Sequence, residues 1–258
     1  GPLLGGILAM LSYASLFVFT VLTSVVVAVI IFTKLADPRR TAGQVDRFRP
    51  RDLLRIGKNR AFLVLCLASI PLSVVLGQMT STFALFSEDV VGISVAEVGY
   101  LYALNGAMVV LLQLPMARYI NRFRMSHVLA AGSLMYAVGY IILGAASDMW
   151  VLVVSMIITT LGENTTSPAS TNLVANISPE NERGRYMGVS GIFYTFGWSV
   201  GPLVGGVLYD SLVADPVVLW ASIASISLLS MAGFALLGRI IPRAVDRVDG
   251  RTPGSQAG

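Results

Sequence analysis

The positions of the basic residues constrain this chain more than any other feature of its sequence. All 18 Lys and Arg residues fall into four clusters, at 34–60, 118–124, 183–185 and 239–251. Each interval between two clusters is apolar and is long enough for two membrane-spanning helices of about 20 residues joined by a turn. The charge pattern therefore predicts three helical hairpins that cross a membrane.

Acidic residues near the middle of each interval complete this pattern. The first interval carries Glu88, Asp89 and Glu97, the second Asp148, and the third Asp210 and Asp215. Cytoplasmic loops retain Lys and Arg, so the basic clusters are predicted to lie on the cytoplasmic face and the acidic turns on the opposite face.

Composition excludes several classes of protein. Hydrophobic residues make up 55% of the chain, charged residues make up 12%, and the mean hydropathy is +0.76, which excludes a water-soluble domain. The net charge of +4 lies in loops that flank apolar segments, where it would orient helices and meet anionic lipid rather than nucleic acid. A single cysteine, Cys66, and a single histidine, His127, cannot supply a structural metal site, and no cofactor is expected.

The predicted fold is an all-α polytopic membrane protein with seven full spans and a stub at the N-terminus. The stub covers residues 1–11, and 242–258 form a predicted disordered cytoplasmic tail. Residues 1–36 are assigned to the end of a first helical half, 37–60 to a basic cytoplasmic linker and 61–241 to a second half of six helices. The predicted spans are 15–33, 61–86, 98–117, 128–146, 150–176, 186–209 and 217–238.

A repeated motif predicts that the chain is the C-terminal part of a longer protein. Residues 1–8 match residues 201–208 at six of eight positions, and both differences exchange one aliphatic residue for another. The alternative, that the first two residues remain from a protease cleavage site, does not account for the six that follow. The motif glycines and prolines are Gly1, Pro2, Gly5 and Gly6 in the first copy and Gly201, Pro202, Gly205 and Gly206 in the second, preceded by Gly197.

Two six-helix units, a long basic central loop and this motif in the fifth helix of each unit resemble the major facilitator superfamily. The second copy with Gly197 is similar to the antiporter signature of the drug:proton antiporter branch, which carries out multidrug efflux. The loop 117–124 resembles the family's Gly-x-x-x-Asp-Arg-x-Gly-Arg loop, with Asn121 at the acidic position and Arg124 at the second glycine. The arginines of this loop and of the run 179–188 are Arg118, Arg122, Arg183 and Arg185.

The resemblance implies a secondary transporter in the cell membrane, with its site between two halves near the midplane. The expected function is proton-coupled efflux of small amphipathic compounds by alternating access. A sugar or metabolite transporter of the same superfamily is the alternative. The expected partners are the lipid bilayer, a small-molecule substrate, protons and the half that precedes this chain. A membrane enzyme is not expected, because the sequence has no phosphate-binding loop, no His pair and no Ser nucleophile motif.

Glu163 is the one acidic or basic residue, apart from Cys and Tyr, within the predicted full spans. A charge at mid-membrane costs at least ~2.5 kcal/mol, so this carboxylate should face protein or a water-filled cavity. Ser155, Thr159, Glu163, Thr166 and Ser170 follow helical spacing on one face, with Thr160, Asn164, Ser167 and Thr171 beside them. This polar face predicts a cavity in which Glu163 couples protons or recognises cations. The alternative is a neutral Glu163 that forms a hydrogen bond to another helix.

Weaker cavity candidates lie on the other predicted helices. Asn105 is near the centre of its span, Gln78 and Gln113 lie toward opposite ends of theirs, and Tyr194 and Trp198 are one turn apart. Each can also serve interhelical hydrogen bonding or plain packing.

Overall fold

The computed structural model describes residues 13–34 and 56–247. The predicted stub with Gly1, Pro2, Gly5 and Gly6, linker residues 37–55 and tail residues 248–258 lie outside the described residues. The chain divides into two units, Gly1–Arg55 and Ile56–Gly258, and each is considered by itself.

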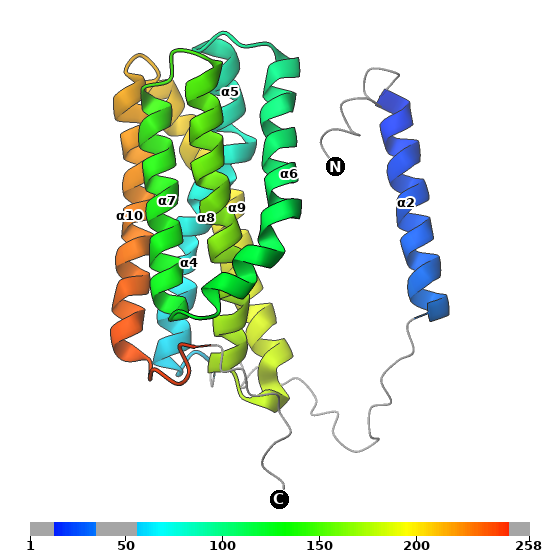
Figure 1. Cartoon of the computed structure of the whole chain (residues 1–258), viewed down its shortest axis with the longest axis vertical. Coiled ribbons are helices and arrows are strands. Elements are labelled where there is room, and N and C mark those ends of the chain that lie inside the picture. Colours follow the sequence, from blue (N-terminus) through cyan, green and yellow to red (C-terminus); the bar gives the residue numbers. More distant parts are fainter. Residues whose placement is uncertain (1–12, 35–55, 248–258) are drawn as a thin grey trace, which may run out of the picture. The chain divides into compact units, whose positions relative to one another are not determined.

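The described part of the first unit is one helix, α2 (Tyr13–Lys34), at the place of the predicted span 15–33. The second unit is a bundle of helices that run roughly alongside one another (Figure 1). Its helices are α4 (Arg60–Gly77), α5 (Thr82–Asp89), α6 (Val95–Ile120), α7 (Met125–Gly144), α8 (Met149–Ile177), α9 (Arg183–Leu212) and α10 (Pro216–Ile240). No strand occurs among the described residues, so the predicted all-α class holds for them.

The acidic turns begin helices. Glu97 accepts a hydrogen bond from the Ser94 backbone, and the Ser94 side chain accepts one from the Glu97 backbone, which forms a capping box at the start of α6. Asp148 Oδ1 accepts hydrogen bonds from two backbone N–H groups of α8, and Asp215 caps α10 in the same way. Three of the six acids of these turns, Glu97, Asp148 and Asp215, thus also fix where helices start.

The predicted span 61–86 lies within the apolar segment Arg60–Asp89, but this segment is not one regular helix. The segment ends as an α-helix at Gly77, passes through a 3-10 turn (Gln78–Thr80) and resumes as α5. Ser81 has φ −130° and ψ −84°, outside the helical region, so it interrupts the regular hydrogen bonding.

Five of the described helical segments are long and apolar enough to cross a membrane. They are Arg60–Asp89, Val95–Ile120, Met125–Gly144, Glu180–Leu212 and Pro216–Ile240. Helix α8 is not among them because its polar face lowers its hydropathy, and the apolar part of α2, Phe17–Thr33, is shorter. The count of seven full spans therefore stays a prediction.

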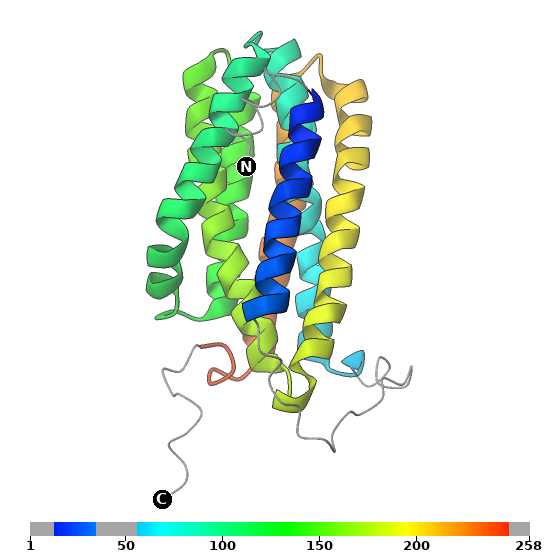
Figure 2. The same cartoon turned by 90° about the vertical axis from the view of Figure 1, so that its right-hand side faces the viewer.

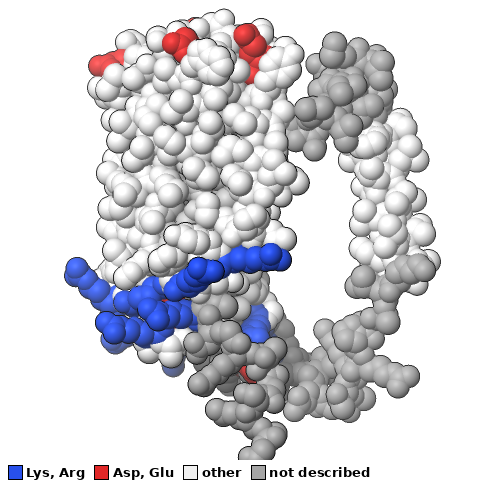
Figure 3. Space-filling model, in the orientation of Figure 1, with Lys and Arg blue, Asp and Glu red and all other residues white. Residues whose placement is uncertain are grey.

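The order of packing within the second unit is α9, α4, α10, α7, α8 and α6, each against the next (Figure 2). Trp220 of α10 is fully buried, stacked on Tyr140 with ring centroids 5.3 Å apart and edge-on to Phe86 at 5.3 Å. In the face that Figure 3 shows, Lys and Arg of this unit gather at one end and Asp and Glu at the other. This separation agrees with the charge pattern of the sequence.

The predicted disordered tail does not begin at Pro242. Residues 242–247 form a turn whose Asp246 is fully buried, and the Met125 backbone N–H donates to the Asp246 carbonyl at 2.7 Å. The sequence interpretation missed this ordered turn because polar contacts hold it, and the segment has few of the apolar residues that usually indicate order.

Candidate functional site

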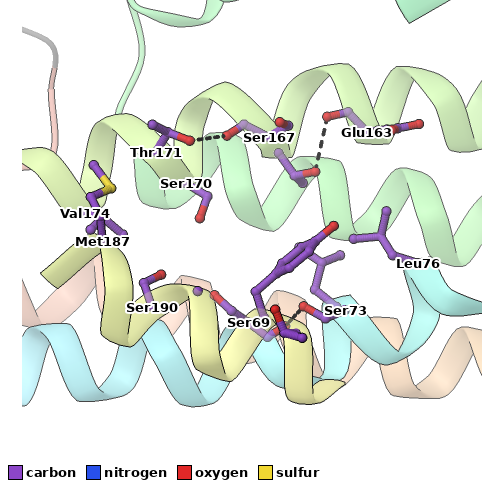
Figure 4. A pocket seen from close by; sticks show the side chains of 15 residues that line it. Ser69, Ser73, Leu76, Glu163, Ser167, Ser170, Thr171, Val174, Met187 and Ser190 are labelled. Atoms are coloured by element: carbon purple, nitrogen blue, oxygen red, sulfur yellow. Dashed lines mark hydrogen bonds between the residues drawn. The ribbon is translucent and has the colours of Figure 1, made fainter. Parts of the chain in front are cut away.

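A cavity of about 350 Å³ lies between α4, α8 and α9 (Figure 4). Hydroxyl side chains from all three helices line it, together with Glu163, Tyr194 and a few apolar residues. The lining residues are Ser69, Leu72, Ser73, Leu76, Glu163, Thr166, Ser167, Ser170, Thr171, Val174, Met187, Ser190, Gly191, Tyr194 and Thr195.

Glu163 is half-buried in the wall of this cavity. The Asn105 side-chain amide, on α6, donates to Glu163 Oε2 at 3.0 Å and to Thr160 Oγ1 at 3.0 Å. Glu163 is the only carboxylate in the lining, and no Lys, Arg or His lines the cavity within the described part of the chain. The wall therefore carries one group able to hold negative charge among neutral hydrogen-bonding groups.

The polar face of α8 divides between the cavity and a helix interface. Glu163, Thr166 and Ser170 line the cavity as predicted. Ser155 and Thr159 do not, because they face α7: the Ser155 hydroxyl donates to the Gly139 carbonyl at 2.9 Å, and Thr159 is 2% exposed.

Glycines on α7 allow it to pack closely against α8. A Cβ added at Gly139 would lie 2.5 Å from the Thr159 methyl, and one at Gly132 would lie 2.4 Å from the Thr166 methyl. Small side chains let α7 and α8 approach closely, so part of the predicted cavity stripe is used for packing.

The remaining cavity candidates have different surroundings. Tyr194 lines the cavity, whereas Trp198 is 44% exposed and Gln113 is exposed, both outside the lining. Asn164 is buried, and its Nδ2 has no hydrogen-bond partner among the described residues. Asn105 does not line the cavity, but its side chain donates a hydrogen bond to Glu163 from α6.

Gln78 joins two helices instead of lining the cavity. Its Nε2 donates to the Gly201 carbonyl at 2.8 Å and to the Val74 carbonyl at 2.9 Å, and its Oε1 accepts from Thr82 Oγ1 at 2.7 Å. The side chain is 0% exposed. The Gln78 amide therefore links the irregular segment after α4 to α9 by hydrogen bonds.

The glycine motif on α9 forms this interface with α4. A Cβ at Gly197 would lie 2.6 Å from the Ile70 carbonyl oxygen, one at Gly201 would lie 2.7 Å from the Val74 carbonyl oxygen, and one at Gly205 would lie 2.0 Å from Gln78 Oε1. Gly206 has no atom within 4 Å of such a Cβ. Three motif glycines therefore permit close backbone approach, which brings the α9 wall of the cavity against α4, and Gly206 does not take part. Pro202 lies within α9, which continues through it as a helix.

The predicted loop arginines lie away from the cavity. Arg118, Arg122 and Arg183 are exposed and Arg185 is half-buried, and none of the four lines the cavity. Arg118 lies in the last turn of α6, and Arg183 and Arg185 lie in the first turn of α9.

Several lining residues were missed by the sequence interpretation. Ser69 and Ser73 of α4 are one helical turn apart, as are Gly191 and Thr195 of α9, with Met187 and Ser190 in the turn before. A pair of hydroxyls one turn apart on an apolar span is a weak signal, and only the packing of α4 beside α8 shows that Ser69 and Ser73 face Glu163's cavity.

The chain is similar in sequence to several proteins whose names refer to drug resistance. The quinolone resistance protein NorA of Staphylococcus aureus (strain COL) is 25% identical over 219 residues, covering 84% of this chain and 56% of the relative. The multidrug resistance protein MdtH of Salmonella arizonae is 31% identical over 146 residues, covering 55% of this chain and 36% of the relative. MdtH of Klebsiella pneumoniae is 27% identical over 179 residues, covering 68% and 44%.

The chain spans about half the length of these curated relatives. The sequence profile of the Major Facilitator Superfamily matches residues 72–256, which is more than half of the chain and includes all of α8 and α9 and the last part of α4. This match confirms the resemblance drawn from the glycine motif and the charge pattern: the chain belongs to the Major Facilitator Superfamily of membrane transporters.

Proposed function

We propose that this chain forms the second half of a proton-coupled exporter of small amphipathic compounds. The observation that supports the proposal is the isolation of the Glu163 carboxylate in a cavity otherwise lined by hydroxyl and apolar groups. Such a wall favours cationic or neutral hydrogen-bonding molecules over anions, because it offers one negative group and no positive one. The drug-resistance names of the relatives point the same way.

Proton coupling is assigned to Glu163. It receives a hydrogen bond from one amide, that of Asn105, and its remaining oxygen lone pairs are open to the cavity or to water. The other half of the site belongs to the part of the protein that precedes this chain.

The test uses the complete protein in proteoliposomes with an imposed pH gradient. Glu163→Gln keeps the size of the side chain and fixes it neutral, so accumulation against a gradient should stop while exchange without energy input continues. Glu163→Asp should retain coupling with a displaced pH optimum. Asp210→Asn, which neutralises an exposed acid at the far end of α9, is the matched control and should pump normally. If Glu163→Gln pumps with an unchanged pH profile, Glu163 is structural and the proposal fails.

The proposed location is the cell membrane, with the basic end of the bundle in the cytoplasm. In a background without Cys66, a cysteine at Asp148 should react with an impermeant thiol reagent in intact cells, and one at Asn181 only after permeabilisation. Equal labelling at both positions would contradict this orientation.

A further inference from the structure

Tyr136 of α7 is a buried titratable residue that the proposed function does not use. It is 0% exposed, and its hydroxyl has no hydrogen-bond partner among the described residues. Most buried hydroxyl groups in proteins have at least one partner, because an unpaired one has lost its contact with water and gained nothing. The single proton of this hydroxyl is therefore available to an acceptor nearby.

Helix packing places Tyr136 beside the residue that precedes Glu163. A Cβ added at Gly162 would lie 3.1 Å from Tyr136 Cδ2 and 3.2 Å from Tyr136 Cε2, so the ring lies against α8 where that helix has no side chain. Tyr136 is also close enough to Glu163 and Tyr194 to interact with both electrostatically. Both of those residues line the cavity, whereas Tyr136 lies outside the lining. Tyr136 thus approaches Glu163 from α7, while Asn105 approaches it from α6.

Three tyrosines are close enough to Glu163 for this electrostatic interaction, namely Tyr136, Tyr140 and Tyr194. The Tyr140 hydroxyl donates to the Val75 carbonyl of α4 at 2.9 Å, so its proton is already used. Tyr194 is 47% exposed and lines the cavity, where water can accept its proton. Of the three, Tyr136 is the one that combines full burial with a proton that no described group accepts.

Glu163 has acceptor sites to match this donor. Each oxygen of a carboxylate can accept about two hydrogen bonds, and Asn105 supplies one donor, at Oε2. No cation lines the cavity among the described residues, so hydrogen bonds are the means by which the fold can stabilise a charge on Glu163. A hydrogen bond to the charged form of an acid favours that form.

We propose that the Tyr136 hydroxyl is a second hydrogen-bond donor to Glu163, used when the carboxylate is charged. It donates directly after a rotation of the Glu163 side chain, or through one bridging water. Tyr136 is thus a positioning residue that sets the pH at which Glu163 exchanges its proton. The inference deepens the proposed function and rests on it, because this donor matters only if Glu163 gains and loses a proton.

The test follows the protonation of Glu163 in the complete protein in detergent micelles. Infrared difference spectra recorded over a pH series report the carbonyl band of protonated carboxyl groups, and the part of the band that is lost in Glu163→Gln belongs to Glu163. Tyr136→Phe removes the hydroxyl and keeps the ring. The pH at which Glu163 is half-protonated should rise by about one to two units, because a hydrogen bond to a charged group can change an equilibrium tenfold to about a hundredfold.

Tyr140→Phe is the matched control on the same helix, because the hydroxyl that it removes is bonded to the Val75 carbonyl. It should make unfolding easier and leave the Glu163 midpoint unchanged. At a pH where Glu163 is neutral, Tyr136→Phe should leave the free energy of unfolding unchanged or raise it, because its hydroxyl has no described partner to lose.

A midpoint that is unchanged or lower in Tyr136→Phe overturns the inference. An equal rise in Tyr136→Phe and Tyr140→Phe also overturns it, because the change would then reflect a loosened fold, and so does a Glu163 band that does not titrate. The readout is the carboxyl itself, so it is separate from the pumping assay. If Glu163→Gln pumps with an unchanged pH profile, the proposed function fails whatever the midpoint in Tyr136→Phe.

Discussion

Two acids of the second unit, Glu163 and Asp246, lie in contrasting surroundings. Asp246 is fully buried and accepts three side-chain or backbone hydrogen bonds, one of them from a charged partner, Arg124. Glu163 is half-buried, accepts from one neutral amide and faces a cavity. The fixed donors around Asp246 join it to neighbouring elements of the fold, whereas Glu163 keeps acceptor sites without fixed donors. The two acids therefore differ in the number of fixed donors that the packing supplies as well as in burial.

The largest effect on the free energy of unfolding is expected for Asp246→Ala. It leaves the mostly buried Arg124 without its partner, so unfolding in detergent micelles should become easier by about 3–5 kcal/mol. Replacing both members, Arg124→Leu with Asp246→Leu, should cost less than Asp246→Ala alone because no buried charge is left unpaired. A loss below ~1 kcal/mol in Asp246→Ala would remove the contrast between the two acids.

The second-largest change in the free energy of unfolding is expected at the interface between α4 and α9, two walls of the Glu163 cavity. Gly201→Ala would place a methyl group 2.7 Å from the Val74 carbonyl and 3.0 Å from the Gly77 Cα, so α9 must move from α4. We expect a loss of about 1–3 kcal/mol in the same unfolding measurement. Gly206→Ala is the matched control in the same motif, and its methyl group meets nothing within 4 Å. Equal losses in the two variants would show that the motif does not set the position of α9.

A smaller effect is expected when Glu163 loses its donor. Asn105→Ala removes the amide that joins Glu163 and Thr160, and the loss should be about 0.5–1.5 kcal/mol in the free energy of unfolding. Gln113→Ala, at an exposed position of the same helix, should change the value by less than ~0.5 kcal/mol. A loss in Asn105→Ala as large as that in Asp246→Ala would mean that Glu163 is held as firmly as Asp246.

The smallest effect is expected for Glu163→Gln. The amide oxygen of the new side chain can still accept from Asn105, and no charged partner is left behind, so the free energy of unfolding should change by less than ~0.5 kcal/mol. The same assay serves, with Asp210→Asn as the reference for a harmless neutralisation. A loss of several kcal/mol would place Glu163 with Asp246 as a structural acid.

The positions of most helices in the second unit could be predicted, because each depends on the charge and hydropathy of neighbouring residues along the chain. The predicted ranges 98–117, 128–146, 150–176, 186–209 and 217–238 each lie in or largely in a described helix. The break at Gln78 could not be predicted, because the Gln78 side chain is satisfied by Gly201, more than a hundred residues away. The residues around Gln78 in the sequence do not indicate a partner so distant along the chain.

The candidate site was predictable in part for the same reason. Glu163 is conspicuous because an acid inside an apolar span is costly wherever the helix faces. The sequence could not predict that Thr159 packs on α7 while Ser170 lines the cavity. Both lie on one polar face of α8, and the packing of the neighbouring helices decides what each one contacts.

By itself, the sequence determined the family, the helical class and the separation of charge between the two ends, because these follow from composition, motif and spacing along one chain. The tertiary structure alone decided which hydroxyls surround Glu163, that Gln78 fastens α4 to α9, and that a polar segment after α10 is ordered around Asp246. The physical reason is that a buried polar group is stabilised by whichever partners the packing brings within hydrogen-bond distance, and those partners are distant in the chain.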